Sequence, residues 1–99
     1  MSTIVRDNAD ELRYELHVDS SLAGEIRYRR EPGARVLVHV EIEPRLEGRG
    51  LGSLLVERVL EDLRTRGLTV VPHAPFVLDF IRRRPEYADL VTADPAVPD

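Results

Sequence analysis

The sequence contains no cysteine, and this absence excludes several kinds of chemistry. A chain without cysteine forms no disulfide and offers neither a thiolate metal ligand nor a cysteine nucleophile. Lysine is absent as well, so all 14 basic residues are arginines. The phosphate loop of nucleotide hydrolases requires Gly-Lys-Ser or Gly-Lys-Thr, and this chain therefore cannot contain one.

Long hydrophobic runs and an excess of positive charge are also lacking. No segment approaches the run of about 20 apolar residues that a membrane-spanning helix requires. Acidic residues begin at Asp7, and the N-terminal segment lacks the apolar core of a signal peptide. The formal net charge of −4 argues against a nucleic-acid partner or an anionic membrane. At 99 residues, we expect a single cytoplasmic domain spanning residues 1–99.

Turn residues and alternating patterns predict three antiparallel strands in the first half of the chain. Residues 1–11 are polar and are expected to be a loose lead-in. Residues 13–19 and 23–30 are typical of strands, and the turn between them precedes a second turn at Glu31-Pro32-Gly33. The third strand has the clearest alternation, and Pro44 ends it. One face is predicted to carry Val36, Val38, Val40 and Ile42, and the other Leu37, His39, Glu41 and Glu43.

Helical periodicity dominates the second half. Apolar residues recur at helical spacing over residues 51–66, and Gly67 is a typical residue after a helix end. The helix then acts as a crossover, so the short apolar strand at 68–71 is predicted to run parallel to an earlier strand. Residues 76–83 predict a short amphipathic helix, and residues 92–99 a flexible tail outside a core of about 13–91.

The most informative motif is the cluster Gly48, Gly50 and Gly52, between the last antiparallel strand and the long helix. Glycines allow backbone N–H groups to approach an anion closely, and the positive end of the helix dipole lies behind them. A dinucleotide fingerprint is excluded, because Ser53 stands where a third glycine is required. The cluster predicts a phosphate cradle, and a plain tight turn is the alternative.

The order strand, glycine-rich turn, long helix, short strand and short helix resembles the acetyl-CoA-binding core of the GNAT acetyltransferase superfamily. The sequence is similar to the smallest single-domain branch of predicted N-acetyltransferases, from about Tyr14 to Val91. Four segments carry the resemblance: His39 to Pro44, Leu46 to Ser53, Val71 to Val77 and Arg84 to Val91. It implies an α/β (α+β) fold with a mixed, mostly antiparallel sheet, one long helix and one short helix.

The same resemblance implies that acetyl-CoA is the co-substrate and that no metal is needed. Backbone groups near Val40 and Ile42 would hold the pantetheine arm. The coenzyme pyrophosphate would lie on Gly48, Arg49, Gly50, Leu51, Gly52 and Ser53. The family pattern begins with glutamine or arginine, and alignment on the helix places Glu47 there. A second register would begin at Arg45.

Four residues are candidates for acid–base chemistry. Glu41 and His39 share a strand face, and either is suited to take a proton from the amine. His73 follows the short strand, and the resemblance suggests Tyr87 as the acid that protonates the thiolate. Each has a structural alternative: a solvated sheet face for Glu41 and His39, a loop histidine for His73 and a packing tyrosine for Tyr87.

Two departures from the branch concern the mechanism. The branch commonly has Cys-Pro-Phe where this chain has Ala74-Pro75-Phe76, and histidine where it has Arg84. A catalytic thiol is therefore excluded, and direct attack of an amine within a ternary complex is expected. The run Arg82 to Arg84 would meet the coenzyme 3′-phosphate or form a solvated charged surface.

The resulting hypothesis is an N-acetyltransferase that acts on a primary amine of a small molecule or protein. One alternative is a non-catalytic coenzyme-A-binding sensor or accessory module. Another is a structural interaction domain in which the glycine turn binds nothing. The sequence specifies neither the acceptor nor the oligomeric state.

Overall fold

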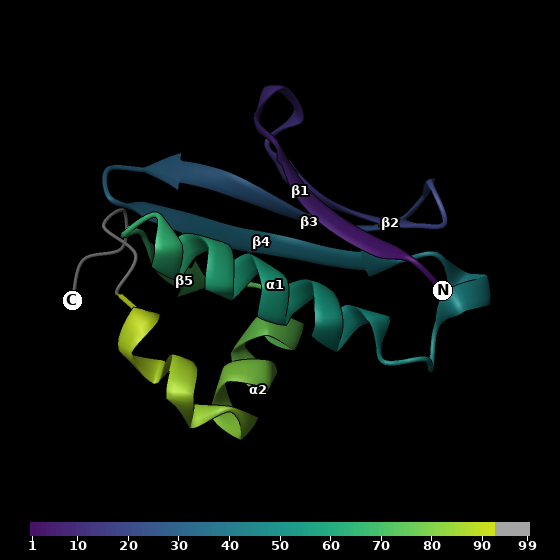
Figure 1. Ribbon diagram of the computed structural model, residues 1–99. Coiled ribbons are helices and arrows are strands. Elements are labelled where there is room, and N and C mark those ends of the chain that lie inside the picture. Colours follow the sequence, from purple (N-terminus) through teal and green to yellow (C-terminus); the bar gives the residue numbers. More distant parts are fainter. Residues whose placement is uncertain (93–99) are drawn as a thin grey trace.

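The computed structural model describes residues 1–92, so all of the predicted tail at 92–99 except Thr92 lies outside the described residues. A five-stranded sheet in the order β1-β2-β3-β4-β5 forms the upper layer in Figure 1. The strands are β1 (Thr3–Asn8), β2 (Arg13–Val18), β3 (Ser21–Glu31), β4 (Ala34–Ile42) and β5 (Thr69–Pro72). The first four pair antiparallel, and β5 pairs parallel to β4 as predicted.

Two helices lie below the sheet in Figure 1. Helix α1 (Leu51–Thr65) runs along the underside of the sheet, and α2 (Pro75–Arg83) packs beneath α1. The short 3₁₀ segments η1 (Ala9–Glu11), η2 (Pro44–Leu46) and η3 (Pro85–Leu90) complete the connections. The predicted fold class, a mixed and mostly antiparallel sheet with one long and one short helix, is confirmed.

The apolar stripe of α1 supplies much of the core. Six of its residues are buried against the sheet and α2. They are Leu51, Leu55, Val56, Val59, Leu60 and Leu63. Gly67, with a φ of 71°, follows the helix in the left-handed conformation expected after a helix end. The helix therefore crosses under the sheet and returns the chain as the parallel strand β5.

The prediction of a loose lead-in at residues 1–11 is wrong, because β1 pairs along β2 at the edge of the sheet. Val5 packs against the core, while Asp7 accepts hydrogen bonds from Tyr28 Oη (2.7 Å) and Arg66 Nη1 (3.0 Å). The polar residues of β1 thus find partners from distant parts of the chain. Composition alone does not reveal such partners.

The predicted single apolar face of β4 is also wrong. Tyr28 pairs with Leu37, but the neighbouring Arg27 pairs with His39, so Val38 is an extra residue that forms a β-bulge. Leu37 is consequently buried in the core, whereas Val38 is exposed. After the bulge, Val40 packs against the core on the same side as Leu37.

A buried carboxylate organises the face of β2 that points away from α1. Glu15 is only 6% exposed and accepts hydrogen bonds from Asn8 Nδ2 (2.9 Å) and Arg13 Nε (2.8 Å). His17 Nε2 lies 3.0 Å from Glu15 Oε1. The hydrogen bonds with His17 and Asn8, together with Arg13, lower the pKa of Glu15 to about 2.

We expect Glu15→Gln to reduce stability at pH 7 by up to about 3 kcal/mol. Because the folded-state pKa lies below the unfolded value of 4.5, this stabilisation is complete above about pH 5 and is lost as the pH falls toward 2. Urea unfolding between pH 2 and 7 measures the difference from wild type, and the exposed Glu11→Gln variant is the control. A difference that does not depend on pH would contradict this role of Glu15.

Candidate functional site

The site begins where β4 and β5 separate. Their parallel pairing ends at Leu37 and Pro72, and the Ala74 N–H donates to the Leu37 carbonyl at 2.8 Å. Helix α2 then leads the chain away from the sheet. Within residues 1–92, the edge of β4 beyond this point has no paired strand. The two strands therefore form a fork with an open edge on β4.

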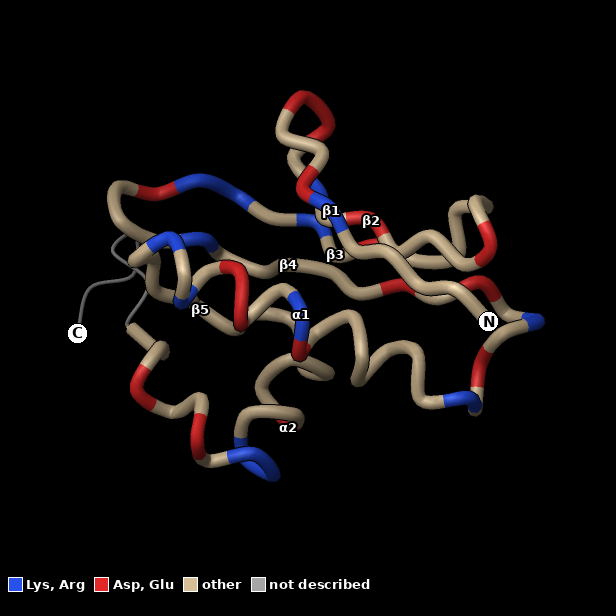
Figure 2. The backbone as a smooth tube through the Cα atoms, viewed as in Figure 1, with Lys and Arg blue, Asp and Glu red and all other residues tan. Residues whose placement is uncertain are grey.

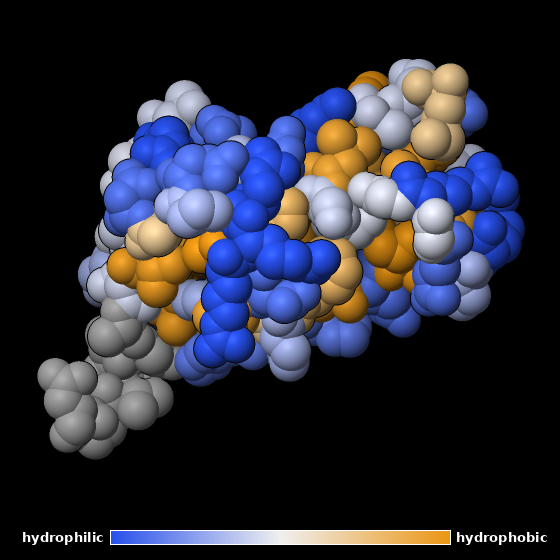
Figure 3. All heavy atoms as spheres, turned by 90° about the horizontal axis from the view of Figure 1, so that it is seen from below, coloured by the Kyte–Doolittle hydropathy of each residue, from blue (hydrophilic) through white to orange (hydrophobic). Residues whose placement is uncertain are grey.

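A pocket of about 420 Å³ extends along this edge to the N-terminus of α1. It is lined by Val40, Ile42, Leu46, Glu47, Gly48, Gly50, Leu51, Gly52, Ser53 and Phe76. Figure 3 views the molecule from the helix side, where apolar surface is exposed between hydrophilic patches. The pocket joins two environments, with apolar walls near the fork and backbone amides at the helix end.

The glycine turn positions the backbone amides at the N-terminus of α1. Gly48 and Gly50 have φ values of 81° and 76°, a left-handed conformation that favours glycine, and Gly50 is the N-cap of α1. A β-carbon at either position would enter open space. Amides in the first turn of a helix have no intrahelical acceptors, and the helix dipole adds positive potential there. This end of the pocket is therefore suited to an anionic ligand.

The structure favours the register that begins at Glu47. Glu47 lines the pocket, whereas Arg45 lines an adjoining hollow and donates from Nε to Glu43 Oε1 at 2.6 Å. Of the six residues predicted to contact pyrophosphate, only Arg49 is in that hollow and not among the pocket residues. An acidic side chain thus stands beside the amides that would bind an anion.

The two sets of predicted residues on β4 lie on opposite faces. Val40 and Ile42 line the pocket on the α1 side. His39 and Glu41 share the other face, as predicted, with 3.7 Å between His39 Nε2 and Glu41 Oε2. Their side chains are 55% and 66% exposed. A ligand that passes through the fork would therefore reach a surface with an imidazole and a carboxylate.

His73 follows the last residue of β5, directly before the Ala74 amide that closes the fork. Its side chain is exposed, and its backbone N–H donates to Val71 O at 3.1 Å. The backbone therefore places His73 next to the apex of the pocket. Its chemical role stays a prediction.

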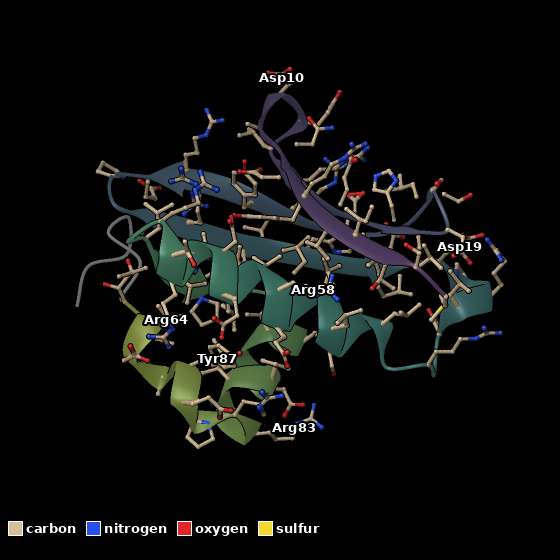
Figure 4. All side chains as sticks on the ribbon, viewed as in Figure 1. Asp10, Asp19, Arg58, Arg64, Arg83 and Tyr87 are labelled. Atoms are coloured by element: carbon tan, nitrogen blue, oxygen red, sulfur yellow. The ribbon has the colours of Figure 1, made fainter. Side chains whose placement is uncertain are left out.

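The structure does not bring Tyr87 to the pocket. The residue is buried, and its hydroxyl donates to Glu61 Oε1 at 2.8 Å, on the part of α1 near Arg64 in Figure 4. Burial and this hydrogen bond raise the pKa of Tyr87 to about 12. Glu61 is ten residues after Leu51, or about 15 Å along the helix. This geometry favours a packing role.

Two arginines of the charged run at the C-terminal end of α2 are paired with neighbouring acids. Arg83 Nη2 donates to Asp79 Oδ2 at 2.6 Å, and Arg84 donates to Glu86 and Glu57. Figure 2 places this basic segment at the bottom of the view, well away from the glycine turn. The arrangement favours the solvated-surface interpretation of these arginines.

Phe76 is a pocket residue that the sequence interpretation missed. It is 40% exposed and stands opposite β4 at the start of α2. An apolar residue in an amphipathic helix is usually assigned to the core, so periodicity gave no signal for this role. The nearby Gly52 reveals it, because a β-carbon there would lie 2.9 Å from Phe76 Cζ.

No group of three or more histidine, aspartate or glutamate side chains in residues 1–92 is arranged to hold a metal ion. None of the helices in the described part combines the length and apolar content needed to cross a membrane.

Comparisons with solved structures show the fold. The chain is similar to a GCN5-like protein from Staphylococcus aureus, with 19% identity, a TM-score of 0.68, and 92% of this chain and 89% of that chain covered. It is also similar to the ribosomal-protein-S18-alanine N-acetyltransferase from Escherichia coli, with 17% identity and a TM-score of 0.60. That alignment covers 74% of this chain and 50% of the other.

A third similar structure is the PaiA N-acetyltransferase from Thermoplasma acidophilum in complex with coenzyme A, with 17% identity and a TM-score of 0.54. The alignment covers 76% of this chain and 49% of that chain, so this chain spans about half the length of the Thermoplasma and Escherichia coli enzymes. No curated protein sequence matches significantly. The family model for GCN5-related N-acetyl-transferases matches residues 13–90, and the chain therefore belongs to this family.

Proposed function

We propose that the protein transfers the acetyl group of acetyl-CoA to a primary amine in a ternary complex. The observation that carries this proposal is the continuity of the pocket from the open edge of β4 to the amides at the N-terminus of α1. A ligand with an anionic end and a long, partly apolar arm fits such a pocket. We further propose that residues 1–99 act as one minimal domain.

The pyrophosphate, the pantetheine arm and the thioester of acetyl-CoA would each meet a matching surface. The pyrophosphate would accept hydrogen bonds from the amides of the glycine turn, where Gly48 and Gly50 leave space for it. The amides of the pantetheine arm would pair with the open edge of β4 near Val40 and Ile42, as an added strand does. The thioester would then lie at the fork.

We propose that proton transfer is carried out by residues on the face of β4 opposite the pocket. The nitrogen of a neutral amine attacks the thioester carbonyl, so that an N–C bond forms and the C–S bond breaks. Glu41 or His39, directly or through water, would take the proton that the nitrogen loses, and a proton is finally returned to the thiolate. Holding both reactants in one complex supplies much of the rate enhancement.

A non-catalytic coenzyme-A-binding module is the second candidate. Two observations favour it: Glu47 lines the anionic end of the pocket, and the buried Ala74 stands where the branch has cysteine. Both candidates require coenzyme A binding, but only the enzyme transfers the acetyl group. Mass spectrometry of a panel of primary amines incubated with the protein and acetyl-CoA separates them.

The coenzyme assignment predicts that Gly50→Glu abolishes binding of acetyl-CoA and coenzyme A. The new side chain would enter the space of the pyrophosphate with a like charge. Calorimetric titration of both ligands, with ATP as a negative control, measures the effect. Gly33→Glu is the matched control, because Gly33 has a similar φ of 72° and open surroundings in the β3–β4 turn. Equal affinities in wild type and Gly50→Glu would refute the cradle.

Glu47→Gln should increase the affinity for coenzyme A about two- to fivefold at low salt. A negative charge near bound phosphates is unfavourable, and a charge at a helix end contributes about 0.3–1 kcal/mol. The gain should shrink at higher ionic strength. Titrations at two salt concentrations measure it, with the remote Asp10→Asn, at the tip labelled in Figure 4, as control. Weaker binding in Glu47→Gln would mean that Glu47 helps to hold the ligand.

Substitutions at Glu41 and Tyr87 should affect the rate of acetyl transfer differently. We expect Glu41→Gln to lower kcat about 100-fold or more, because a positioned base contributes on that scale. Tyr87→Phe should leave kcat within about threefold and instead cost about 1 kcal/mol of stability through the lost hydrogen bond to Glu61. Steady-state assays with an accepted amine, together with thermal unfolding, measure both. A large loss of kcat in Tyr87→Phe with unchanged stability would restore tyrosine as the acid.

A further inference from the structure

Coenzyme A carries one more anionic group, the 3′-phosphate of its ribose. Along the coenzyme, the pantetheine arm follows the thioester, then the pyrophosphate, and last the ribose with its adenine and 3′-phosphate. If the thioester lies at the fork and the pyrophosphate on the glycine turn, the 3′-phosphate lies beyond the turn, on the side away from the fork. The basic run Arg82 to Arg84 is well away from the glycine turn, so another surface must receive this group.

A hollow of about 260 Å³ adjoins the pocket on the side away from the fork. Leu46 of η2 lines both the pocket and the hollow. Strand β4 runs from the fork at Leu37 to Ile42, and η2 follows. There the Glu43 N–H donates to the Ala23 carbonyl at 2.8 Å, beside the β2–β3 turn that forms the rest of the hollow. The hollow therefore lies at the end of β4 opposite to the fork.

Two arginines line this hollow, Arg45 from η2 and Arg49 from the glycine turn. Arg49 stands between Gly48 and Gly50, so the turn that lines the pocket also supplies a guanidinium to the hollow. Arg49 forms no hydrogen bond or ion pair with another residue of the described range 1–92. Arg45 uses Nε to bind Glu43, and its Nη groups have no hydrogen-bond partner in the same range. Free guanidinium N–H groups are suited to phosphate oxygens.

The β2–β3 turn contributes Asp19 and Ser21 to the lining of the hollow. The Asp19 carboxylate accepts a hydrogen bond from the Ser2 N–H at 2.8 Å, and Figure 4 labels Asp19 at the end of the sheet where β4 runs into η2. The Ser21 hydroxyl is able to donate to a phosphate. Pockets for whole small molecules measure about 300–1,000 Å³. The smaller hollow is therefore suited to one group of a ligand that also occupies the pocket.

We propose that this hollow is the subsite for the 3′-phosphate of coenzyme A, with Arg49 as the main partner and Arg45 as the second. This inference rests on the proposed function, because it assumes that the pyrophosphate lies on the glycine turn. It makes the protein selective for coenzyme A over dephospho-coenzyme A, which lacks only the 3′-phosphate. Arg49 and Arg45 thereby become specificity-determining residues for the coenzyme.

The experiment titrates coenzyme A and dephospho-coenzyme A calorimetrically into wild type, Arg49→Gln and the double variant Arg45→Gln/Arg49→Gln. Arg82→Gln is the matched control, because Arg82 is also exposed and also without a partner in residues 1–92. In wild type, we expect coenzyme A to bind about 5- to 20-fold more tightly, since two exposed ion pairs contribute on that scale. This ratio should fall to about two in Arg49→Gln and to about one in the double variant. Arg82→Gln should keep the wild-type ratio.

A further variant tests the opposite sign. Asp19→Asn removes the negative charge that lines the hollow. Asparagine tolerates the left-handed φ of 48° at this position and keeps an acceptor for the Ser2 N–H. The preference for coenzyme A over dephospho-coenzyme A should therefore rise about two- to threefold. A preference that is unchanged or lower would overturn the placement of the 3′-phosphate in this hollow.

Failure of the inference and failure of the proposed function give different results. Equal affinity of wild type for the two ligands, or the same ratio in wild type and the double variant, overturns the subsite alone. An Arg82→Gln ratio as low as that of Arg49→Gln also overturns it, because the effect would then come from overall charge. If neither ligand binds wild type, the proposed function itself is overturned. Binding of dephospho-coenzyme A to every variant within about twofold of wild type shows that the variants are folded and that the pyrophosphate site is intact.

Discussion

The parallel pairing of β4 with β5 stops at Leu37 and Pro72, and the hydrogen bond from the Ala74 amide to the Leu37 carbonyl fixes the chain there. Everything at the site follows from this separation. It leaves the backbone of β4 open along Val40 and Ile42, and it starts α2 close enough to α1 for Phe76 to reach Gly52. Unpaired backbone groups are costly when buried, so such an edge is stable only if water or a ligand reaches it.

The bulge at Val38 determines which side chains of β4 lie on each face of the sheet beyond the fork. In a regular strand, residues 37, 39 and 41 would share a face. Because Leu37 lies in the core, His39 and Glu41 would then point toward α1. The extra residue inverts the order, so Val40 and Ile42 line the pocket and the two polar residues face the opposite side. The separation of an apolar cofactor wall from a polar reaction face thus depends on one inserted residue.

The sequence predicted those parts of the structure that depend on local periodicity. The long helix, β2 and β5 were found within one or two residues, because burial of a helix stripe or a short apolar strand leaves a regular pattern. The glycine turn was found because left-handed residues next to a helix start are a local requirement. These are the features that neighbouring residues along the chain specify by themselves.

Features that depend on contacts between distant segments were not predicted. Strand β1 is polar in composition, and Asp7 accepts its hydrogen bonds from Tyr28 and Arg66, which lie in distant segments. The bulge could not be predicted from the alternation, because Val38 is apolar like Val36 and Val40. The place of Phe76 in the pocket was not predicted, because the residue it lies against, Gly52, belongs to another helix. Two contacts of this kind, Phe76 against Gly52 and Ile42 against Gly24 of β3, shape the pocket without leaving a pattern in either segment.

A protein with a net charge of −4 would be expected to repel an anionic ligand such as coenzyme A. Salt screens charges over a Debye length of about 8 Å, so most of the acidic residues contribute little at the glycine turn. The nearby negative charges include Glu47 and Glu43, and Glu43 is paired with Arg45. They are opposed by Arg45 and Arg49 in the adjoining hollow and by the helix end, which carries about half a positive charge. Because these nearby charges largely offset one another, affinity for an anionic ligand must come mainly from the direction of the backbone amides. That direction is set by Gly48 and Gly50, and it is independent of the charge of the protein as a whole.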